Sequence, residues 1–152
     1  MAQYLGLTNV VMHRTEPKEC KELLFYDLDQ KDEHYAVELK RLLDKMQTSY
    51  IIYWTKNGIH AVGLTPLEPI QRGAYFQHLK DYFHEFYGGQ IIRISAKEGE
   101  VRELYSFSFR YPYIMKLAEK YSKMLGIQPY DMPIYGEMPD YSVNLMRYWS
   151  NG

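Results

Sequence analysis

The sequence predicts a single α+β domain. Three observations lead to this prediction: segments with strand-like and helix-like patterns alternate along the chain, 46% hydrophobic and 24% charged residues are normal for a globular protein, and 152 residues fit one domain. No repeat or low-complexity block divides the chain. We expect a core at about residues 21–126 and a C-terminal arm at about 127–152.

The first predicted strand is the apolar run Leu23-Leu24-Phe25-Tyr26, which is typical of a central strand buried on both faces. It ends in Asp27-Leu28-Asp29. Asp32 is expected to cap a helix that runs to about Gln47. The helix is predicted from apolar residues at helical spacing, namely Tyr35, Leu39, Leu42, Leu43 and Met46.

A β-hairpin is predicted next. Residues 50–55 are rich in β-branched and aromatic side chains, the turn dipeptide Asn57-Gly58 follows, and a second apolar strand runs from Ile59 to Leu64. An Asn-Gly pair between two such segments is a strong hairpin signal.

The second half of the core repeats the alternation. Pro69 suits the first turn of a second helix, which carries an apolar stripe and is expected to end at Gly88-Gly89. A strand is predicted over residues 90–95. The stripe of this helix consists of Phe76, Leu79, Phe83 and Phe86.

An additional strand and a C-terminal helix follow. From Val101 to Phe109, aromatic residues alternate with polar ones, which predicts a half-exposed strand with Tyr105, Phe107 and Phe109 on one face. The helix after Pro112 should bury Ile114, Leu117, Ala118, Tyr121 and Leu125. The core order is thus β-α-β-β-α-β, as in RRM and ferredoxin-like folds. Because such folds serve many functions, the site residues must decide the function.

Composition excludes several protein classes. The formal net charge is −1, so no global basic field indicates a polyanionic partner, and the single cysteine excludes an intramolecular disulfide framework. No apolar segment is long enough to cross a bilayer and no signal peptide is evident, so we expect a cytoplasmic protein without membrane contact. The aromatic fraction of 16%, carried mainly by 16 tyrosines, is high; tyrosine is frequent where a ring is buried and its hydroxyl has a partner.

Asp27 and Asp29 are the first candidate site residues. Residues two apart in a strand point to the same side, so their carboxylates are expected to converge at the end of the strand. Oxygen ligands at this spacing suit Mg²⁺ or Mn²⁺. The alternative is a solvated pair in which Asp29 begins a turn.

His60 is the second candidate, in an otherwise apolar strand just after the hairpin turn. Thr55, Lys56 and the backbone N–H groups of the tip would surround it and form a cradle for a triphosphate. The alternative is a histidine that serves only the packing of the sheet.

These two segments together resemble a known family. Phe25-Tyr26-Asp27-Leu28-Asp29 and the hairpin from Tyr53 to Val62 are similar to the first two motifs of the archaeo-eukaryotic primase (primase-polymerase) superfamily. The resemblance implies a minimal catalytic core with Asp27 and Asp29 as catalytic metal ligands for Mg²⁺ or Mn²⁺. It also implies that His60 contacts the nucleotide phosphates, with Thr55 and Lys56 as weaker candidates.

The chain departs from the family pattern at two places. Thr55, Lys56 and Asn57 stand where the second motif usually has its serine and first glycine. The later core strand, which in the family carries a third aspartate, reads Ile91-Ile92-Arg93-Ile94-Ser95. Arg93 is expected to bind phosphate instead, and no spacing selects a replacement acid among Glu98, Glu100 and Glu103.

The sequence therefore supports a primase/polymerase-like nucleotidyltransferase core that is degenerate or needs a partner, such as a second copy or a replication protein. The alternative is a non-catalytic, RRM-like nucleic-acid-binding or replication-accessory protein that stacks bases on Tyr53, Trp54, Tyr105 and Phe107. A structural or interaction protein is a third option. A rolling-circle type of endonuclease, with Tyr121 as nucleophile, lacks its second metal-binding histidine after His60.

Overall fold

The computed structural model describes residues 2–13, 19–84, 91–93, 103–110, 114–125 and 141–150. It is an α+β structure with antiparallel sheets and three helices, which confirms the predicted fold class. The strands are β1 (Ala2–His13), β2 (Cys20–Glu22), β3 (Phe25–Leu28), β4 (Tyr50–Trp54), β5 (Ile59–Gly63), β6 (Ile91–Arg93), β7 (Glu103–Ser108) and β8 (Tyr141–Ser150). The helices are α1 (Glu33–Lys45), α2 (Pro69–Phe83) and α3 (Ile114–Leu125).

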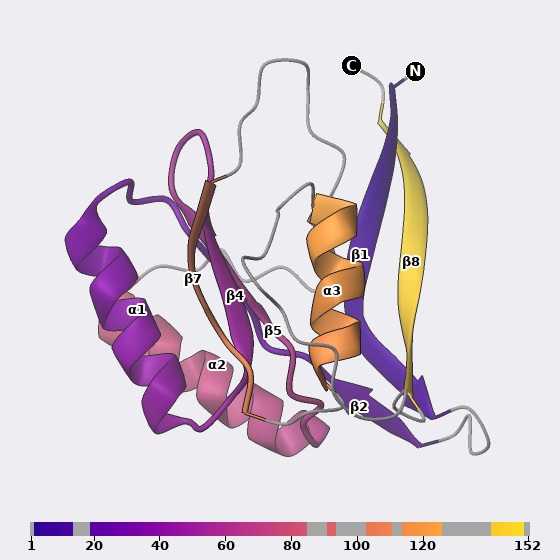
Figure 1. Cartoon of the computed structure of the whole chain (residues 1–152), viewed down its shortest axis with the longest axis horizontal. Coiled ribbons are helices and arrows are strands. Elements are labelled where there is room, and N and C mark those ends of the chain that lie inside the picture. Colours follow the sequence, from indigo (N-terminus) through magenta and orange to yellow (C-terminus); the bar gives the residue numbers. More distant parts are fainter. Residues whose placement is uncertain are drawn as a thin grey trace.

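The central layer is an antiparallel sheet with the strand order β3-β5-β4-β7. Helices α1 and α2 cover one face of this sheet, while α3 and the long strand β1 lie on the other (Figure 1). The arrangement is compatible with a ferredoxin-like β-α-β core.

Both faces of the sheet are buried because apolar side chains alternate between two cores. In β3 and the residue before it, Leu24, Tyr26 and Leu28 pack toward α1 and α2. Leu23 and Phe25 pack toward α3 and β1. An unbroken apolar run is what a strand covered on both faces requires, although within the described ladder β3 is an outer strand rather than the predicted central one.

A second sheet was not expected from the sequence. β1 pairs with β8 along one side, and with β2 and β6 along the other. The strand predicted at residues 90–95 therefore joins β1 rather than the central sheet, and residues 141–150 of the predicted arm form a strand. These pairings join segments far apart in the chain, which local patterns do not reveal.

Two of the predicted helices match the structure closely, and one ends early. Asp32 caps α1 and accepts a hydrogen bond from the His34 N–H (2.9 Å). All five residues predicted inward on α3 are buried. α2 ends at His84, whose φ of 59° is left-handed, before the predicted stop at Gly88-Gly89, which lies outside the described residues.

β7 contains an irregularity that redirects one aromatic side chain. Its register with β4 shifts between Ile52 and Tyr53. Tyr105 consequently packs with the α1–α2 core, whereas Phe107 packs with the α3 core. The ring centroids of Tyr105 and Trp54 are 5.5 Å apart. The prediction that these two rings share one face is wrong, because a bulge shifts the two-residue period of a strand.

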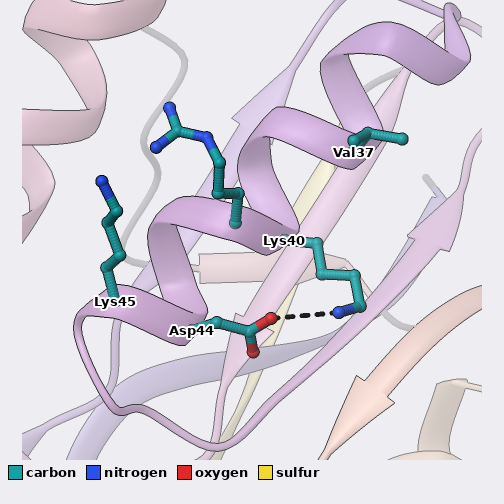
Figure 2. A pocket seen from close by; sticks show the side chains of 5 residues that line it. Val37, Lys40, Asp44 and Lys45 are labelled. Carbon is teal, nitrogen blue, oxygen red and sulfur yellow. Dashed lines mark hydrogen bonds and ion pairs between the residues drawn. The ribbon is translucent and has the colours of Figure 1, made fainter.

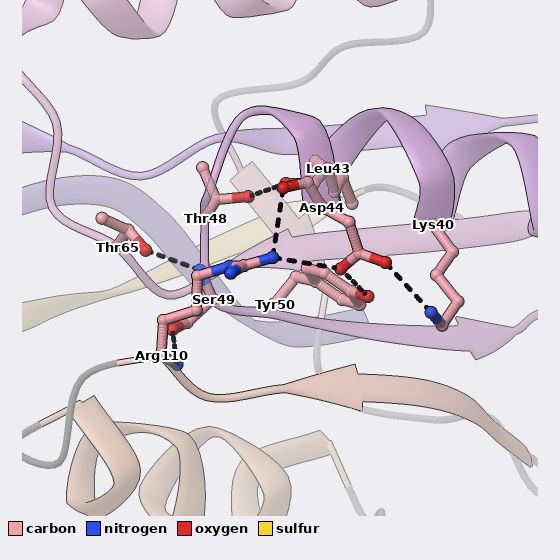
Figure 3. Close-up of polar contacts among 8 residues, drawn as sticks. All are labelled: Lys40, Leu43, Asp44, Thr48, Ser49, Tyr50, Thr65 and Arg110. Carbon is pink, nitrogen blue, oxygen red and sulfur yellow. Dashed lines mark hydrogen bonds and ion pairs between the residues drawn. The ribbon is translucent and has the colours of Figure 1, made fainter.

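A polar clamp holds the C-terminal end of α1 to the sheet (Figure 3). The Asp44 carboxylate accepts hydrogen bonds from the Tyr50 hydroxyl (2.7 Å) and the Lys40 ammonium (3.0 Å). The Arg110 guanidinium donates to the Asp44 backbone carbonyl (3.1 Å), and the backbone N–H of Arg110 donates to the Ser49 hydroxyl oxygen (2.7 Å). The clamp thus joins α1, β4 and the residues after β7.

We expect the clamp to weaken in acid. Burial alone would raise the pKa of the Asp44 carboxyl, but the hydrogen bonds from Tyr50 and Lys40 outweigh it and hold this pKa below its ordinary value of 3.8. A lowered pKa contributes stability above the unfolded value, and this stability is lost as the pH falls through the folded value. Since the carboxylate is about one-third exposed, the contribution is on the order of 1 kcal/mol or less.

The measurement is urea unfolding between pH 7 and pH 2.5. Wild type should exceed Asp44→Asn in stability at pH 7, and the difference should shrink below about pH 4. Asp81→Asn, at an exposed position on α2, is the control and should follow wild type. A difference that stays constant to pH 2.5 would contradict the ionic role of Asp44.

Candidate functional site

Three polar side chains form a row across neighbouring strands of the central sheet. Asp27 of β3 lies opposite His60 of β5, which in turn lies opposite Tyr53 of β4. His60 Nε2 is 3.0 Å from Asp27 Oδ1, and His60 Nδ1 is 2.8 Å from the Tyr53 hydroxyl oxygen. The imidazole is therefore held at both ring nitrogens.

The row lies where an apolar face of the sheet ends. Two residues before it along β3, and at the matching positions of β5 and β4, stand Phe25, Val62 and Ile51, which are buried under α3 and β1. Because every second residue of a strand faces the same side, the three polar residues continue this face beyond the apolar core.

Burial increases along the row from β3 to β4. The Asp27 side chain is 38% exposed, that of His60 is 20% exposed, and Tyr53 is fully buried. The carboxylate is thus accessible to a ligand, while the phenol belongs to the protein interior. The histidine lies between the two.

The hairpin tip lies beside this row. The Thr55 N–H donates to the Gly58 carbonyl (2.8 Å), and the Gly58 N–H donates to the Thr55 hydroxyl oxygen (3.0 Å). The Thr55 hydroxyl hydrogen thus remains able to donate to a ligand. Lys56 is exposed, and no ion pair to it is found among the described residues.

Asp29 follows directly after β3, which ends at Leu28. It is exposed. The tip of the hairpin contacts the backbone here: a Cβ added to Gly58 would lie 2.1 Å from the Leu28 carbonyl oxygen and 2.9 Å from the Asp29 Cα. The structure therefore brings the Asp-x-Asp segment and the Thr55–His60 segment to the same end of the sheet, as Figure 1 shows for the β4–β5 loop and the connection into α1.

Arg93, the remaining predicted site residue, lies on a different sheet. It is in β6, opposite Gly6 of β1. The sequence pattern placed its strand in the same sheet as Asp27 and His60. Its side chain is outside the described part, so the contact of Arg93 with phosphate stays a prediction.

Two aromatic side chains do not have the accessibility that the alternatives require. Tyr53 is fully buried, so it offers no surface for stacking a base. Tyr121 is fully buried in the α3 core, and its hydroxyl has no hydrogen-bond partner among the described residues. Burial also raises the pKa of Tyr121 well above its ordinary value, so it is not an exposed nucleophile.

The described residues contain no group of three His, Cys, Asp or Glu side chains arranged to hold a metal ion. Asp27 stands in the row, and Asp29 follows it by two residues, just beyond the end of β3. Mg²⁺ is commonly bound by one or two carboxylates together with substrate phosphates rather than by a cage of protein ligands. The donor set therefore fits a cation that arrives with a nucleotide better than a permanently bound metal.

A shallow hollow of about 510 Å³ lies elsewhere, on the outer surface of α1 (Figure 2). It is lined by Val37, Lys40, Arg41, Asp44 and Lys45. Lys40 is paired with Asp44 (3.0 Å) and Arg41 with Glu38 (2.8 Å). Because its walls come from one helix and most of its charges are paired within that helix, this hollow is not the functional site.

The contact of Tyr53 with His60 was not predicted from the sequence, which named Tyr53 only as a base-stacking residue of the alternative function. A two-residue Asn57-Gly58 turn would place Thr55 opposite His60. The hairpin instead has a four-residue loop in which Trp54 pairs with Ile59, so Tyr53 lies opposite His60.

No family model, no curated protein and no solved structure matches this chain. In the part of the chain that the structure describes, no helix combines the length and apolar character needed to cross a membrane.

Gly58→Ala tests whether contact between the tip and β3 builds the site. We expect it to destabilise the protein by about 1–3 kcal/mol, because the added Cβ would overlap the Leu28 carbonyl. It should also perturb the amide resonances of Asp27 and Asp29. Gly73→Ala on α2 is the matched control: nothing lies within 4 Å of its added Cβ, so this change should stabilise by about 0.5–1 kcal/mol. Equal stability of the two variants by urea unfolding would exclude the tight contact.

Proposed function

We propose that this chain is a primase/polymerase-like nucleotidyltransferase core that binds a nucleoside triphosphate with Mg²⁺ or Mn²⁺. It would act in nucleic-acid replication in the cytoplasm. The observation that carries this proposal is the direct contact between Asp27 and His60 at the end of the sheet. The two sequence segments that resemble primase motifs are thus neighbours in space.

The chemistry of the site suits a triphosphate. Lys56 supplies a positive charge, the Thr55 hydroxyl and the His60 imidazole supply donors, and all three belong to one hairpin. Phosphate oxygens prefer such charged and hydrogen-bonding donors. Asp27 and Asp29 would hold the divalent cation, which when bound neutralises charge on the phosphates.

A second candidate is a non-catalytic nucleotide- or nucleic-acid-binding protein on the same scaffold. The number of carboxylates favours it: the described site offers two, where the resemblance implies three. In either case a second copy of the chain or a replication protein would complete the function. Both candidates bind a nucleotide. They differ in that only the nucleotidyltransferase would extend a primer, which a primer-extension assay measures.

Cation-dependent nucleotide binding is the first test. Titration calorimetry with Mn²⁺ and a nucleoside triphosphate should detect binding to wild type. Asp27→Ala and Asp29→Ala should each weaken it about ten-fold or more, and the double variant should abolish it, because a charged hydrogen-bonded or coordinating partner contributes roughly 1.5–3 kcal/mol.

Asp81→Ala is the matched control, since it removes an exposed aspartate from α2 rather than one from the Asp27–Asp29 segment. It should bind as wild type does. The proposal fails if wild type binds no nucleotide, or if the double variant binds as tightly as wild type.

The role of Lys56 is tested by a comparison of two exposed lysines. Lys56→Ala should weaken triphosphate binding by about three- to ten-fold at low salt and by less at high salt, because exposed charges are screened. Lys45→Ala is the control: Lys45 ends α1, near the Tyr50 end of β4, whereas Lys56 follows the Trp54 end. Equal losses in the two variants would indicate a general charge effect instead of a site at the hairpin.

A further inference from the structure

We propose that Tyr53 is a positioning residue that keeps the neutral His60 imidazole in the tautomer with hydrogen on Nε2. This places the N–H on the side of Asp27 and of an incoming phosphate. That the N–H donates to a phosphate rests on the proposed function; the assignment of the tautomer does not.

The hydrogen-bond partners dictate the tautomer. A carboxylate only accepts hydrogen bonds, so the contact of Asp27 Oδ1 with His60 Nε2 requires hydrogen on Nε2. In a neutral imidazole the other nitrogen then carries none and can only accept. The Tyr53 hydroxyl, 2.8 Å from Nδ1, is the donor that this arrangement needs.

The two partners differ in how permanent they are. Asp27 is accessible, and in the proposed function its carboxylate shares its charge with a cation, which weakens it as an acceptor for His60. Tyr53 is fully buried, and its ring packs edge-to-face against the imidazole, with the two ring centroids 5.3 Å apart. The phenol therefore stays in place when Asp27 is engaged, and it then continues to hold the ring and its tautomer.

This arrangement predicts that the effects of removing Asp27 and of removing Tyr53 on the His60 tautomer are not additive. Asp27 requires hydrogen on Nε2, and with Asp27 removed we expect the Tyr53 hydroxyl to keep donating to Nδ1 and so to hold the same tautomer. With both removed, the imidazole is free to exchange between its two tautomers and to turn about its side-chain bond. The double variant should therefore differ from both single variants.

The test is nitrogen-15 NMR of the His60 ring at alkaline pH, where imidazoles are neutral, with the signals assigned by comparison with His60→Gln. Wild type, Asp27→Ala and Tyr53→Phe should each show two widely separated ring nitrogen signals, with hydrogen on Nε2. In Asp27→Ala/Tyr53→Phe the two signals should move toward each other. Tyr26→Phe in the Asp27→Ala background is the control, because it removes another buried hydroxyl, on the opposite face, which donates to the Leu79 carbonyl (3.4 Å). It should leave the signals separated.

Two results would overturn the proposal: signals that remain widely separated in the double variant, or signals that already converge in Asp27→Ala alone. Urea unfolding of each variant verifies that the protein stays folded. In calorimetry, Tyr53→Phe should weaken binding of the Mn²⁺–triphosphate pair by about two- to ten-fold, the effect of one lost hydrogen bond. If wild type binds no triphosphate but the NMR pattern holds, the proposed function fails and the role of Tyr53 in holding His60 stands.

Discussion

The position of β5 between β3 and β4 is the constraint on which the site depends. Asp27 and Tyr53 belong to strands that do not pair with each other, and each is placed opposite His60 by the register of its own strand with β5. A shift of one residue in either ladder would turn the side chain into the opposite core. Apolar residues on the same face as the row, such as Phe25, Val62 and Ile51, must face α3 and β1. They therefore fix the register of β5 with β3 and with β4. The packing of the core therefore sets the geometry of the polar row.

Much of the fold could be predicted because its signals are local. Helical spacing identified the buried faces of α1 and α3, and the Asn57-Gly58 dipeptide located the β4–β5 hairpin. The second sheet could not be predicted in this way, because β1 pairs with β6 and β8, and even its nearest pair in these ladders, Thr8 with Ile91, joins residues far apart in the sequence. The turn of Tyr105 away from Phe107 arises from a bulge, and the alternation of residues along β7 gives no sign of it.

The site was predicted in its components and not in its full geometry. Asp27 and His60 were each chosen for their chemistry, and the structure places them in contact. The pairing of Tyr53 with His60 was not predicted, because the length of the hairpin loop, four residues rather than two, decides which residue lies opposite His60. Arg93 was assigned to the site on the assumption of one sheet, and this assumption failed when β6 paired with β1. Residue types are visible in a sequence, whereas the partner of a strand depends on the whole core.

The tyrosines of this chain help to explain how a buried sheet keeps polar groups at both of its ends. Tyr50 and Tyr53 lie three residues apart on β4, so they point to opposite faces. The hydroxyl of Tyr50 holds Asp44 in the clamp on α1, and that of Tyr53 holds His60 at the candidate site. A phenylalanine would fill the same space, but Asp44 would lose one of its donors and His60 Nδ1 would lose the donor that the Tyr53 hydroxyl provides. Within the described residues, buried tyrosine thus contributes an apolar ring to the core and a fixed donor to its edge, and at the Tyr53 end this donor lies next to an accessible carboxylate where a ligand can bind.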